Sequence, residues 1–389
     1  MNVFPLSPVD YIFTGVGSQP ITFAFSYNQI LDPGLLKKSL HETLNYFPIL
    51  RSKLVRISET DYEFHISEEG LTFAVLESEV NFEEAGSIEQ YIIPVSSIAG
   101  KPLTKITLTQ TSGGSVLAVS VSHALVDGFS YFHFFSAWAR ICRGEPIIKP
   151  SLQRDVLLAN FNKSEKIITA NDIYTNCGLF YGEKRRELQS EPVHEERFFL
   201  SKDTIRSILE DTKNEPGISL TDNDIITALL WQKYIPLWSK ENRNQKTYVT
   251  CPVDIRRVLS GLPRNYFGCA LSFGTAAINF NGLLEASIGE LAILVRNSIR
   301  KVKNDYILRS FGTLESLRKQ KGLDAMEEIH LRHPHHGIIV TNLTRLPIRD
   351  LNFGSGAPLD FLSYVDVLAG AAVLPAENGV DIYVAHPPQ

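Results

Sequence analysis

Strand-like and helix-like patterns alternate through both halves of the chain, and this mixture most constrains the fold. In the first half, polar–apolar alternation predicts strands at 21–27, 51–57, 62–66, 104–109 and 115–122. Helical spacing of apolar residues predicts helices over 33–47 and 129–142. Asp32 supplies a cap and Pro33 a first helical residue for the earlier helix, and Pro48 ends it.

The second half shows the same mixture of elements. Helices are expected to begin near Lys202 and after Thr221, where Thr221 and Asp224 resemble a capping box. A long amphipathic helix is expected over 283–303. Strands are expected at 247–252, 270–279, 337–342, 365–369 and 380–386.

A polar, weakly patterned stretch over 150–195 separates the two halves and indicates a crossover. We therefore expect an N-terminal domain over 1–170, a crossover over 171–195 and a C-terminal domain over 196–389. The fold class that this predicts is α/β or α+β with mixed sheets.

Composition excludes several classes of function. The chain has 389 residues, 44% of them hydrophobic, a net charge of -5 and a pI near 6.1. A large core is expected, and no basic footprint for nucleic acid is present. The four cysteines form no CxxC pair, which favours a reduced cytoplasm. The first residues do not resemble a signal peptide, and no apolar run reaches the roughly 18 residues of a membrane span.

The segment from Ser120 to Gly128 carries the clearest chemical signal. A predicted strand runs into His123, a turn ends in Asp127 and Gly128, and an aromatic helix follows. With a reference pKa near 6.5, roughly three quarters of such a histidine is neutral at pH 7 and able to accept a proton. The plainer interpretation is a structural histidine at a strand end, followed by an ordinary turn.

Further blocks along the chain decide between these interpretations. LSPVD at 6–10, the helix and strand over 36–54, and the run from Gly113 to Gly128 follow one another in the first half. VDIRR at 253–257, NYFG at 265–268, TNLTRLP at 341–347 and NFGSG at 352–356 follow in the second. Together they resemble the BAHD acyltransferases, within the chloramphenicol-acetyltransferase-like group.

The resemblance implies two similarly built α/β domains with a tunnel between them that reaches His123 from both faces. It implies acyl-CoA as co-substrate, a small-molecule alcohol or amine as acceptor, and no tightly bound cofactor or metal. His123 would act as general base, so that the acceptor attacks the thioester directly in a ternary complex. No GxSxG elbow offers a competing serine nucleophile. A cytoplasmic monomer serving secondary metabolism is the expected setting.

Asp127 is expected to support the site rather than react. In the family this carboxylate points away from the histidine and pairs with an arginine, and Arg256 is the matching position. A carboxylate against His123 would raise the pKa of the imidazole and favour the charged form, which cannot act as a base. Gly128 is expected to permit the turn or close packing.

The resemblance assigns roles to the two later blocks. Thr341 matches the position whose hydroxyl can donate to the developing oxyanion. Asn352, Gly354 and Gly356 belong to a block that is architectural in relatives. CoA-binding residues are not identified, although arginine or lysine is required for the phosphates.

Four positions depart from the family pattern. Asn352 stands where Asp is usual, so a charged pair there becomes at most a neutral hydrogen bond. Ser355 replaces a Trp, Leu343 an aromatic residue, and Cys269 an Asn. These changes argue against a flat aromatic acceptor.

Two other functions and one other site stay open. Transfer from a carrier-protein thioester is one, although condensation-type domains carry a second histidine where Ser122 stands. A non-catalytic ligand-binding relative is the other. His330, His333, His335 and His336 cluster but lack a regular metal-ligand spacing, and Pro334 breaks helical register.

Overall fold

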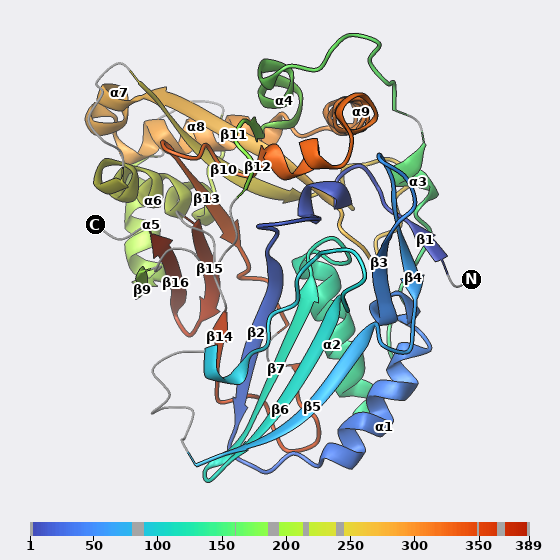
Figure 1. Ribbon diagram of the computed structural model, residues 1–389. Helices are drawn as coiled ribbons and strands as arrows, with labels where there is room; N and C mark the ends of the chain where they lie inside the picture. The colour runs from blue at the N-terminus through green and yellow to red at the C-terminus, as the bar shows by residue number, and fades with distance from the viewer. Residues whose placement is uncertain are drawn as a thin grey trace.

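A computed structural model describes residues 3–79, 89–159, 161–185, 194–212, 218–238, 245–347, 350–363 and 370–386. Helices and strands are mixed in both halves, as the sequence predicts (Figure 1). Within the described residues no helix is long and apolar enough to cross a membrane. The four cysteines are all free thiols.

The first sheet contains five strands in the order β14-β2-β7-β6-β5. Four come from the first half: β2 (Pro20–Tyr27), β5 (Leu71–Ser78), β6 (Thr104–Thr111) and β7 (Gly114–Ser122). The fifth, β14 (Asp360–Ser363), comes from the second half and pairs antiparallel with β2, with Asp360 opposite Ser26. Helices α1 (Pro33–Leu44) and α2 (Gly128–Cys142) pack together against this sheet (Figure 1). Asp32 caps α1 as predicted, accepting from the amides of Gly34 and Leu35.

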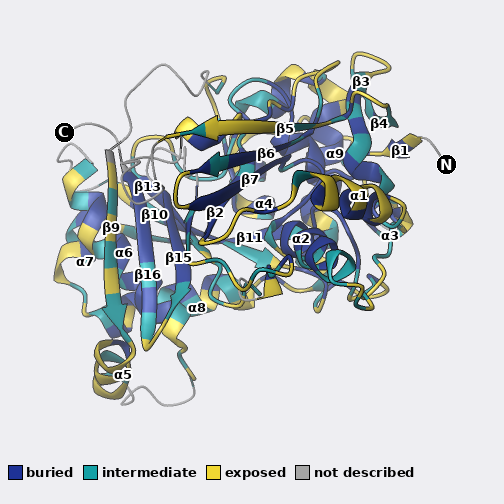
Figure 2. Cartoon of the chain, turned by 90° about the horizontal axis from the view of Figure 1, so that it is seen from below, coloured by how far each residue is buried: buried dark blue, intermediate teal, exposed yellow. Residues whose placement is uncertain are grey.

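The second sheet contains six strands in the order β11-β10-β13-β15-β16-β9. Their bounds are β9 (His194–Ser201), β10 (Lys246–Asp254), β11 (Leu271–Asn279), β13 (Gly337–Asn342), β15 (Gly370–Ala376) and β16 (Gly379–His386). Helices on this side of the molecule are α5 (Lys202–Asp211), α6 (Asp222–Trp238), α7 (Phe280–Glu285) and α8 (Ile288–Arg300). Both large sheets are darkest along their central strands, while the edge strands β5 and β9 are largely exposed (Figure 2).

Smaller elements join the two sheets. A three-stranded sheet has the order β1-β4-β3, from β1 (Val3–Pro5), β3 (Ser52–Arg56) and β4 (Tyr62–Ile66). β8 (Phe180–Tyr181) pairs with β12 (Ile329–His330), and α4 (Ala170–Cys177) packs against α9 (Asn304–Lys321). The short helix α3 spans Asp155–Leu158. The described residues also contain four 3-10 helices, at Asp10–Phe13, Pro48–Arg51, Glu89–Tyr91 and Asp324–Glu328.

Two links cross the division expected near 171–195. β14 completes the first sheet, and the larger hydrophobic core draws on both halves, from Phe4 to Tyr383. A separate core lies between α6, α8 and the second sheet, around Trp231 and Val295. The domain boundaries themselves stay a prediction.

Several sequence-based expectations were wrong or incomplete. The helix expected over 283–303 is two helices, because Ser287 forms a capping box with Glu290 and starts α8 anew. The helices α4 and α9 and the strands β5, β9 and β15 were missed. Pro48 does not end α1, which stops at Leu44, but begins the 3-10 helix that follows. The strand expected at 365–369 lies outside the described residues.

Candidate active site

His123 lies at the end of the central strand β7, in a turn that backbone and side-chain hydrogen bonds hold in place. Every residue of β7 is buried, and the strand pairs with β2 on one side and β6 on the other. The carbonyl of Ser122 accepts from the amides of Leu125 (3.0 Å) and Val126 (3.3 Å). The Ser122 hydroxyl accepts from the Ala124 amide and bonds the hydroxyl of Ser97 at 2.6 Å. The backbone on both sides of His123 is therefore fixed.

The surroundings of the His123 imidazole favour its neutral form. Burial lowers its pKa, while the carbonyls of His123 and Val126 and the charge of Asp127 oppose the shift. Its Nδ1 atom is buried, and no contact of Nδ1 meets hydrogen-bond geometry. The ring of Phe13 stacks on the imidazole with centroids 3.9 Å apart and planes 5° from parallel. Sequence patterns did not single out Phe13.

Asp127 caps helix α2 and directs its carboxylate to Arg256. Oδ1 accepts from the Ser130 amide at 2.9 Å, and Oδ2 accepts from the Ala270 amide at 2.9 Å. Arg256 donates to both oxygens, through Nη1 at 2.7 Å and Nη2 at 2.9 Å. Burial alone would raise the pKa of Asp127, but the charge of Arg256 and these hydrogen bonds hold it below its usual value. The expected ion pair is present.

Arg256 connects this turn to the loop that follows β10. Its Nε donates to the carbonyl of Tyr266 and its Nη2 to the carbonyl of Gly268, each at 3.0 Å. Asp254 accepts from Nη1 at 2.9 Å, and the ring of Phe129 lies 4.4 Å below the guanidinium. Only 4% of Arg256 is exposed, so the guanidinium is satisfied inside the protein. The segments 127–130 and 254–270 are thereby fastened together.

Thr341 lies on β13, whose end reaches the His123 turn. Leu343 follows two residues after Thr341. A Cβ atom added to Gly128 would lie 3.4 Å from the Cδ2 atom of Leu343. Gly128 is the first residue of α2 and has no positive φ, and a side chain there would make only an ordinary van der Waals contact, so neither the turn nor close packing explains the glycine. Thr341 itself is half-buried and lies opposite Ala372. The structure thus brings the end of β13 beside the segment that carries His123.

The block Asn352–Gly356 supports the far end of α2. The Asn352 side chain accepts from the amides of Gly354 (2.7 Å) and Gly356 (3.0 Å), both of which have positive φ. Phe353 packs on Trp138 with centroids 4.9 Å apart. Arg143 reaches the backbone carbonyl of Asn352, not its side chain. The neutral Asn352 therefore closes a local turn.

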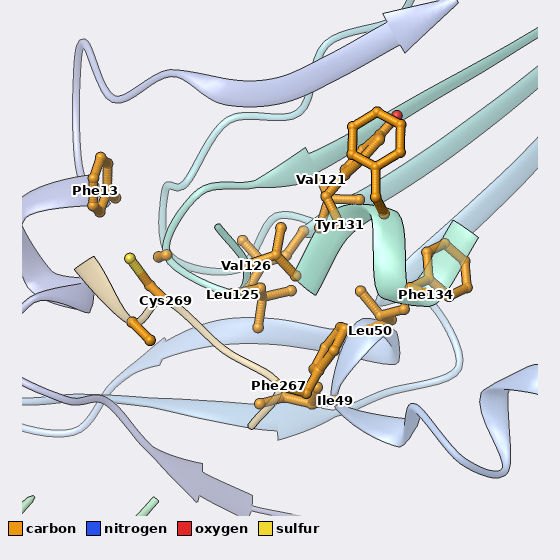
Figure 3. Close-up of a cluster of buried hydrophobic side chains, with 14 of the residues drawn as sticks. Phe13, Ile49, Leu50, Val121, Leu125, Val126, Tyr131, Phe134, Phe267 and Cys269 are labelled. Atoms are coloured by element: carbon orange, nitrogen blue, oxygen red, sulfur yellow. The ribbon is translucent and has the colours of Figure 1, made fainter. Parts of the chain in front are cut away.

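Cys269 belongs to the core beneath the site. Figure 3 shows Leu125 and Val126 in the middle of the buried cluster, with Cys269 on one side and Phe134 on the other. Burial raises the pKa of the Cys269 thiol well above its usual value, so it stays a neutral packing residue.

A cavity of about 840 Å³ opens between β11, α4, α8 and α9. Its lining includes four cations, Arg300, Lys301, Lys303 and Arg309, and no carboxylate. Tyr174 and Tyr306 also line it. None of the four cations has an ion-pair partner in the part of the chain that the structure describes. Sequence reasoning did not identify this cavity, because α9 was missed.

The histidine cluster forms no metal centre among the described residues, where no group of three potential ligands occurs. The His330 ring bonds the carbonyl of Glu183 at 2.6 Å. His333 stacks on Tyr248, and burial and the neighbouring histidines lower its pKa to about 4. These contacts are those of a loop packed before β13.

Comparison with known proteins establishes the family. The family model described as Transferase family matches residues 1–389. The chain belongs to this family, the BAHD acyltransferases. This acyltransferase is 24% identical over 379 residues to omega-hydroxypalmitate O-feruloyl transferase of Arabidopsis thaliana, covering 90% of this chain and 76% of the relative. It is 27% identical over 368 residues to an alcohol acyl transferase 1 of Malus domestica, with the same coverage.

Solved structures show that this acyltransferase has the fold of the group. TRI101 of F. graminearum, complexed with coenzyme A and deoxynivalenol, superposes with a TM-score of 0.76 at 14% identity. That match covers 99% of this chain and 95% of the other. Vinorine synthase superposes with a TM-score of 0.72 at 19% identity, covering 99% and 90% of the two chains. The resemblance stated from the sequence is confirmed for both family and fold class.

Proposed function

We propose that this acyltransferase moves an acyl group from acyl-CoA to a hydroxyl or amine of a small molecule, with His123 as general base. The observation that carries the proposal is the place of the imidazole at the end of β7, where burial lowers its pKa and the Asp127 carboxylate is bound to Arg256 instead. A histidine beside an unpaired carboxylate would hold its proton more tightly. Here the imidazole is free to accept one.

The proposed step involves the second ring nitrogen of His123. Because Nδ1 is buried, Nε2 is the nitrogen that takes the acceptor's proton. The acceptor oxygen or nitrogen attacks the thioester carbonyl, the new C–O or C–N bond forms, and the C–S bond breaks. The departing thiolate takes the proton back from the imidazolium. Thr341, at the end of β13, is the proposed donor to the oxyanion.

The cationic cavity is the proposed site for the phosphates of CoA. β11 connects it to the chemistry, because the Ala270 amide contacts Asp127 while Thr275 lines the cavity. Five residues of extended strand span roughly 17 Å at about 3.4 Å per residue. An extended pantetheine arm has a length of this order. The thioester would thus reach His123 through a tunnel while the nucleotide stays among the cations.

A carrier-protein thioester is the second candidate donor. The starter condensation domain of rhizomide synthetase superposes with a TM-score of 0.62 at 13% identity. Two observations favour CoA instead. Ser122, which stands where such domains carry a second histidine, is bonded to Ser97 and supports the turn. The four unpaired cations match a nucleotide with several phosphates.

We propose a cytoplasmic monomer that acts in secondary metabolism, and the four free thiols support the reduced setting. Light scattering of the purified protein tests the oligomeric state.

The deciding experiment is thiol release from a panel of acyl-CoAs with mixed alcohol and amine acceptors, comparing the wild type with His123→Ala. We expect acceptor-dependent release that falls at least about 10²-fold in the variant. Circular dichroism checks that the variant is folded. Activity that persists in a folded His123→Ala protein would rule out the proposed base. An acyl-carrier protein is added to the panel as an alternative donor. Thiol release from this donor but from no acyl-CoA would identify the carrier-protein thioester as the substrate.

A further inference from the structure

We propose that Phe13 is a positioning residue for His123, and that Arg185 acts through Phe13 by holding the backbone on both sides of it. The inference rests on the proposed function in one respect, namely that His123 is the base. Its geometric part concerns only how the imidazole is held.

The stack between the two rings is unusually close and parallel. Their centroids lie 3.9 Å apart with planes at 5°, whereas aromatic pairs more often lie about 4.5–7 Å apart. Phe13 is only 3% exposed, so its ring cannot swing away into solvent. It covers one face of the imidazole, excludes water from that face and restricts rotation of the ring. A base whose plane is fixed presents Nε2 in one direction only.

Arg185 fixes the chain on both sides of Phe13. Its Nη1 donates to the carbonyl of Ile12 at 2.5 Å and its Nη2 to the carbonyl of Thr14 at 2.6 Å. Burial lowers the pKa of Arg185 to about 10, with Glu327 opposing the shift. The fork of one guanidinium thus spans the residue that carries the stacked ring. This arginine comes from the crossover region, more than 170 positions along the chain.

The start of this segment is anchored separately. Asp10, fully buried, accepts from the Ser7 amide at 2.6 Å and from Arg154. Residues 10–13 form a 3-10 helix whose residues are all buried. Phe13 therefore has a fixed support before it as well as the clamp around it.

A chain of hydrogen bonds joins the two partners of the stack. The Gly15 amide donates to the carbonyl of Ser97 at 2.9 Å. The Ser97 hydroxyl bonds that of Ser122 at 2.6 Å, and Ser122 directly precedes His123. Gly15 has φ +78°, and a side chain there would overlap Glu327. The Phe13 segment and the His123 turn therefore form one connected unit.

The stack has a consequence for the proton affinity of the base. Asp127 is the charged group that acts on His123, and Arg256 pairs with it from the facing loop. Removing the Phe13 ring would admit water to the imidazole face. The pKa of His123 would then rise toward its ordinary value, and more of the base would be protonated near neutral pH.

The test measures the His123 pKa directly and the kinetics separately. The ring signals of His123 are followed by NMR titration, with His123→Ala identifying them among the ten histidines. The variants are Phe13→Leu, which removes the flat ring, and Phe13→Tyr, which keeps it. Phe280→Leu is the control, because it removes a buried phenyl ring from the other hydrophobic core, where Phe280 is 6% exposed.

We expect Phe13→Leu to raise the His123 pKa and to lower kcat about tenfold or more with little change in KM. Phe13→Tyr should retain most of the wild-type pKa and kcat. Phe280→Leu should leave both unchanged. An unchanged His123 pKa in Phe13→Leu, or an equal loss of kcat in Phe280→Leu, would overturn the proposal.

A double-mutant cycle tests the role of Arg185. Arg185→Ala should lower kcat when Phe13 is present. In a protein that already carries Phe13→Leu it should lower kcat little further, because the ring that Arg185 holds in place is already gone. Fully additive losses would mean that Arg185 does not act through Phe13. The NMR titration needs no substrate, so it reports on the stack even if acyl transfer or the role of His123 as base proves wrong.

Discussion

Arg256 contacts both carboxylate oxygens of Asp127, at 2.7 and 2.9 Å, although the two residues are 129 positions apart in the sequence. Both side chains are almost fully buried. The pair closes the loop after β10 onto the start of α2. It also commits the carboxylate to a partner other than His123, which leaves the imidazole able to accept a proton.

Breaking this pair should destabilise the fold. Asp127→Ala leaves the buried guanidinium with only the exposed Asp254 as a carboxylate partner, at a cost of about 3–5 kcal/mol by analogy with other buried pairs. Denaturant unfolding measures the loss. Asp61→Ala is a matched control, because it removes a carboxylate from a more exposed ion pair with Arg318 and Lys319. A loss no larger than that of the control would contradict the assigned role.

The same pair predicts an acid dependence of stability. The folded-state pKa of Asp127 is lowered, so its contribution is present above the unfolded value of about 3.9 and is lost as the pH falls through the folded value. The difference in free energy of unfolding between wild type and Asp127→Asn should therefore shrink as the pH falls below about 4. A difference that stays constant with pH would show that the carboxylate charge is not responsible.

Thr341 should affect kcat more than KM. Thr341→Val keeps the shape of the strand residue but removes the proposed oxyanion donor, and we expect kcat to fall roughly 10²-fold or more. Thr341→Ser keeps the hydroxyl and should recover most of the activity. Steady-state kinetics with a fixed acceptor measure both. Equal activity of the valine and serine variants would exclude the hydroxyl as donor.

The cationic cavity should determine affinity for the nucleotide part of the donor. Arg300→Glu combined with Lys303→Glu should raise the KM for acyl-CoA roughly tenfold, and less at high salt. A short pantetheine thioester without the nucleotide should show an unchanged KM. Arg206→Glu, on the exposed face of α5, controls for net charge. An equal effect on both donors would place the phosphates elsewhere.

Asn352 should contribute to stability but not to chemistry. Asn352→Ala leaves the amides of Gly354 and Gly356 without their side-chain acceptor, at a cost of about 0.5–1.5 kcal/mol. Asn352→Asp keeps an acceptor oxygen and should be close to wild type. Thermal unfolding measures both variants, with kcat expected to stay unchanged. A selective loss of kcat would argue for a role in the site.

Local sequence patterns predicted many of the helices and strands, but they missed α9 and the break between α7 and α8. Sequence patterns located β4 and β13 to the residue, because apolar and polar residues alternate in β4 and β13 begins with a short run of buried apolar residues. α9 was missed although Ile307, Phe311 and Leu314 recur at helical spacing, since polar residues are buried beside them. The break between α7 and α8 was missed because the capping residues Ser287 and Glu290 cause it, and the spacing of apolar residues does not reveal a cap.

The site divides in a similar way. His123, Asp127 and Arg256 were found because the family motif marks them, and the structure brings Asp127 and Arg256 into contact. Phe13 and Arg185 could not be found, because their relevance arises from tertiary contacts between distant segments. The cavity cations look like ordinary surface charges until α8 and α9 are seen to bring them together.

The pairing of β14 with β2 sets an order of events during synthesis. Ser26 and Asp360 are separated by 334 positions, so the ribosome makes almost the entire chain before β2 can gain this neighbour. At about 5–20 residues per second, that interval lasts roughly 17–67 s. Until then β2 presents an unpaired edge to other nascent chains. This edge is therefore open to chaperones and to other chains well before the turn that carries His123 has its complete surroundings.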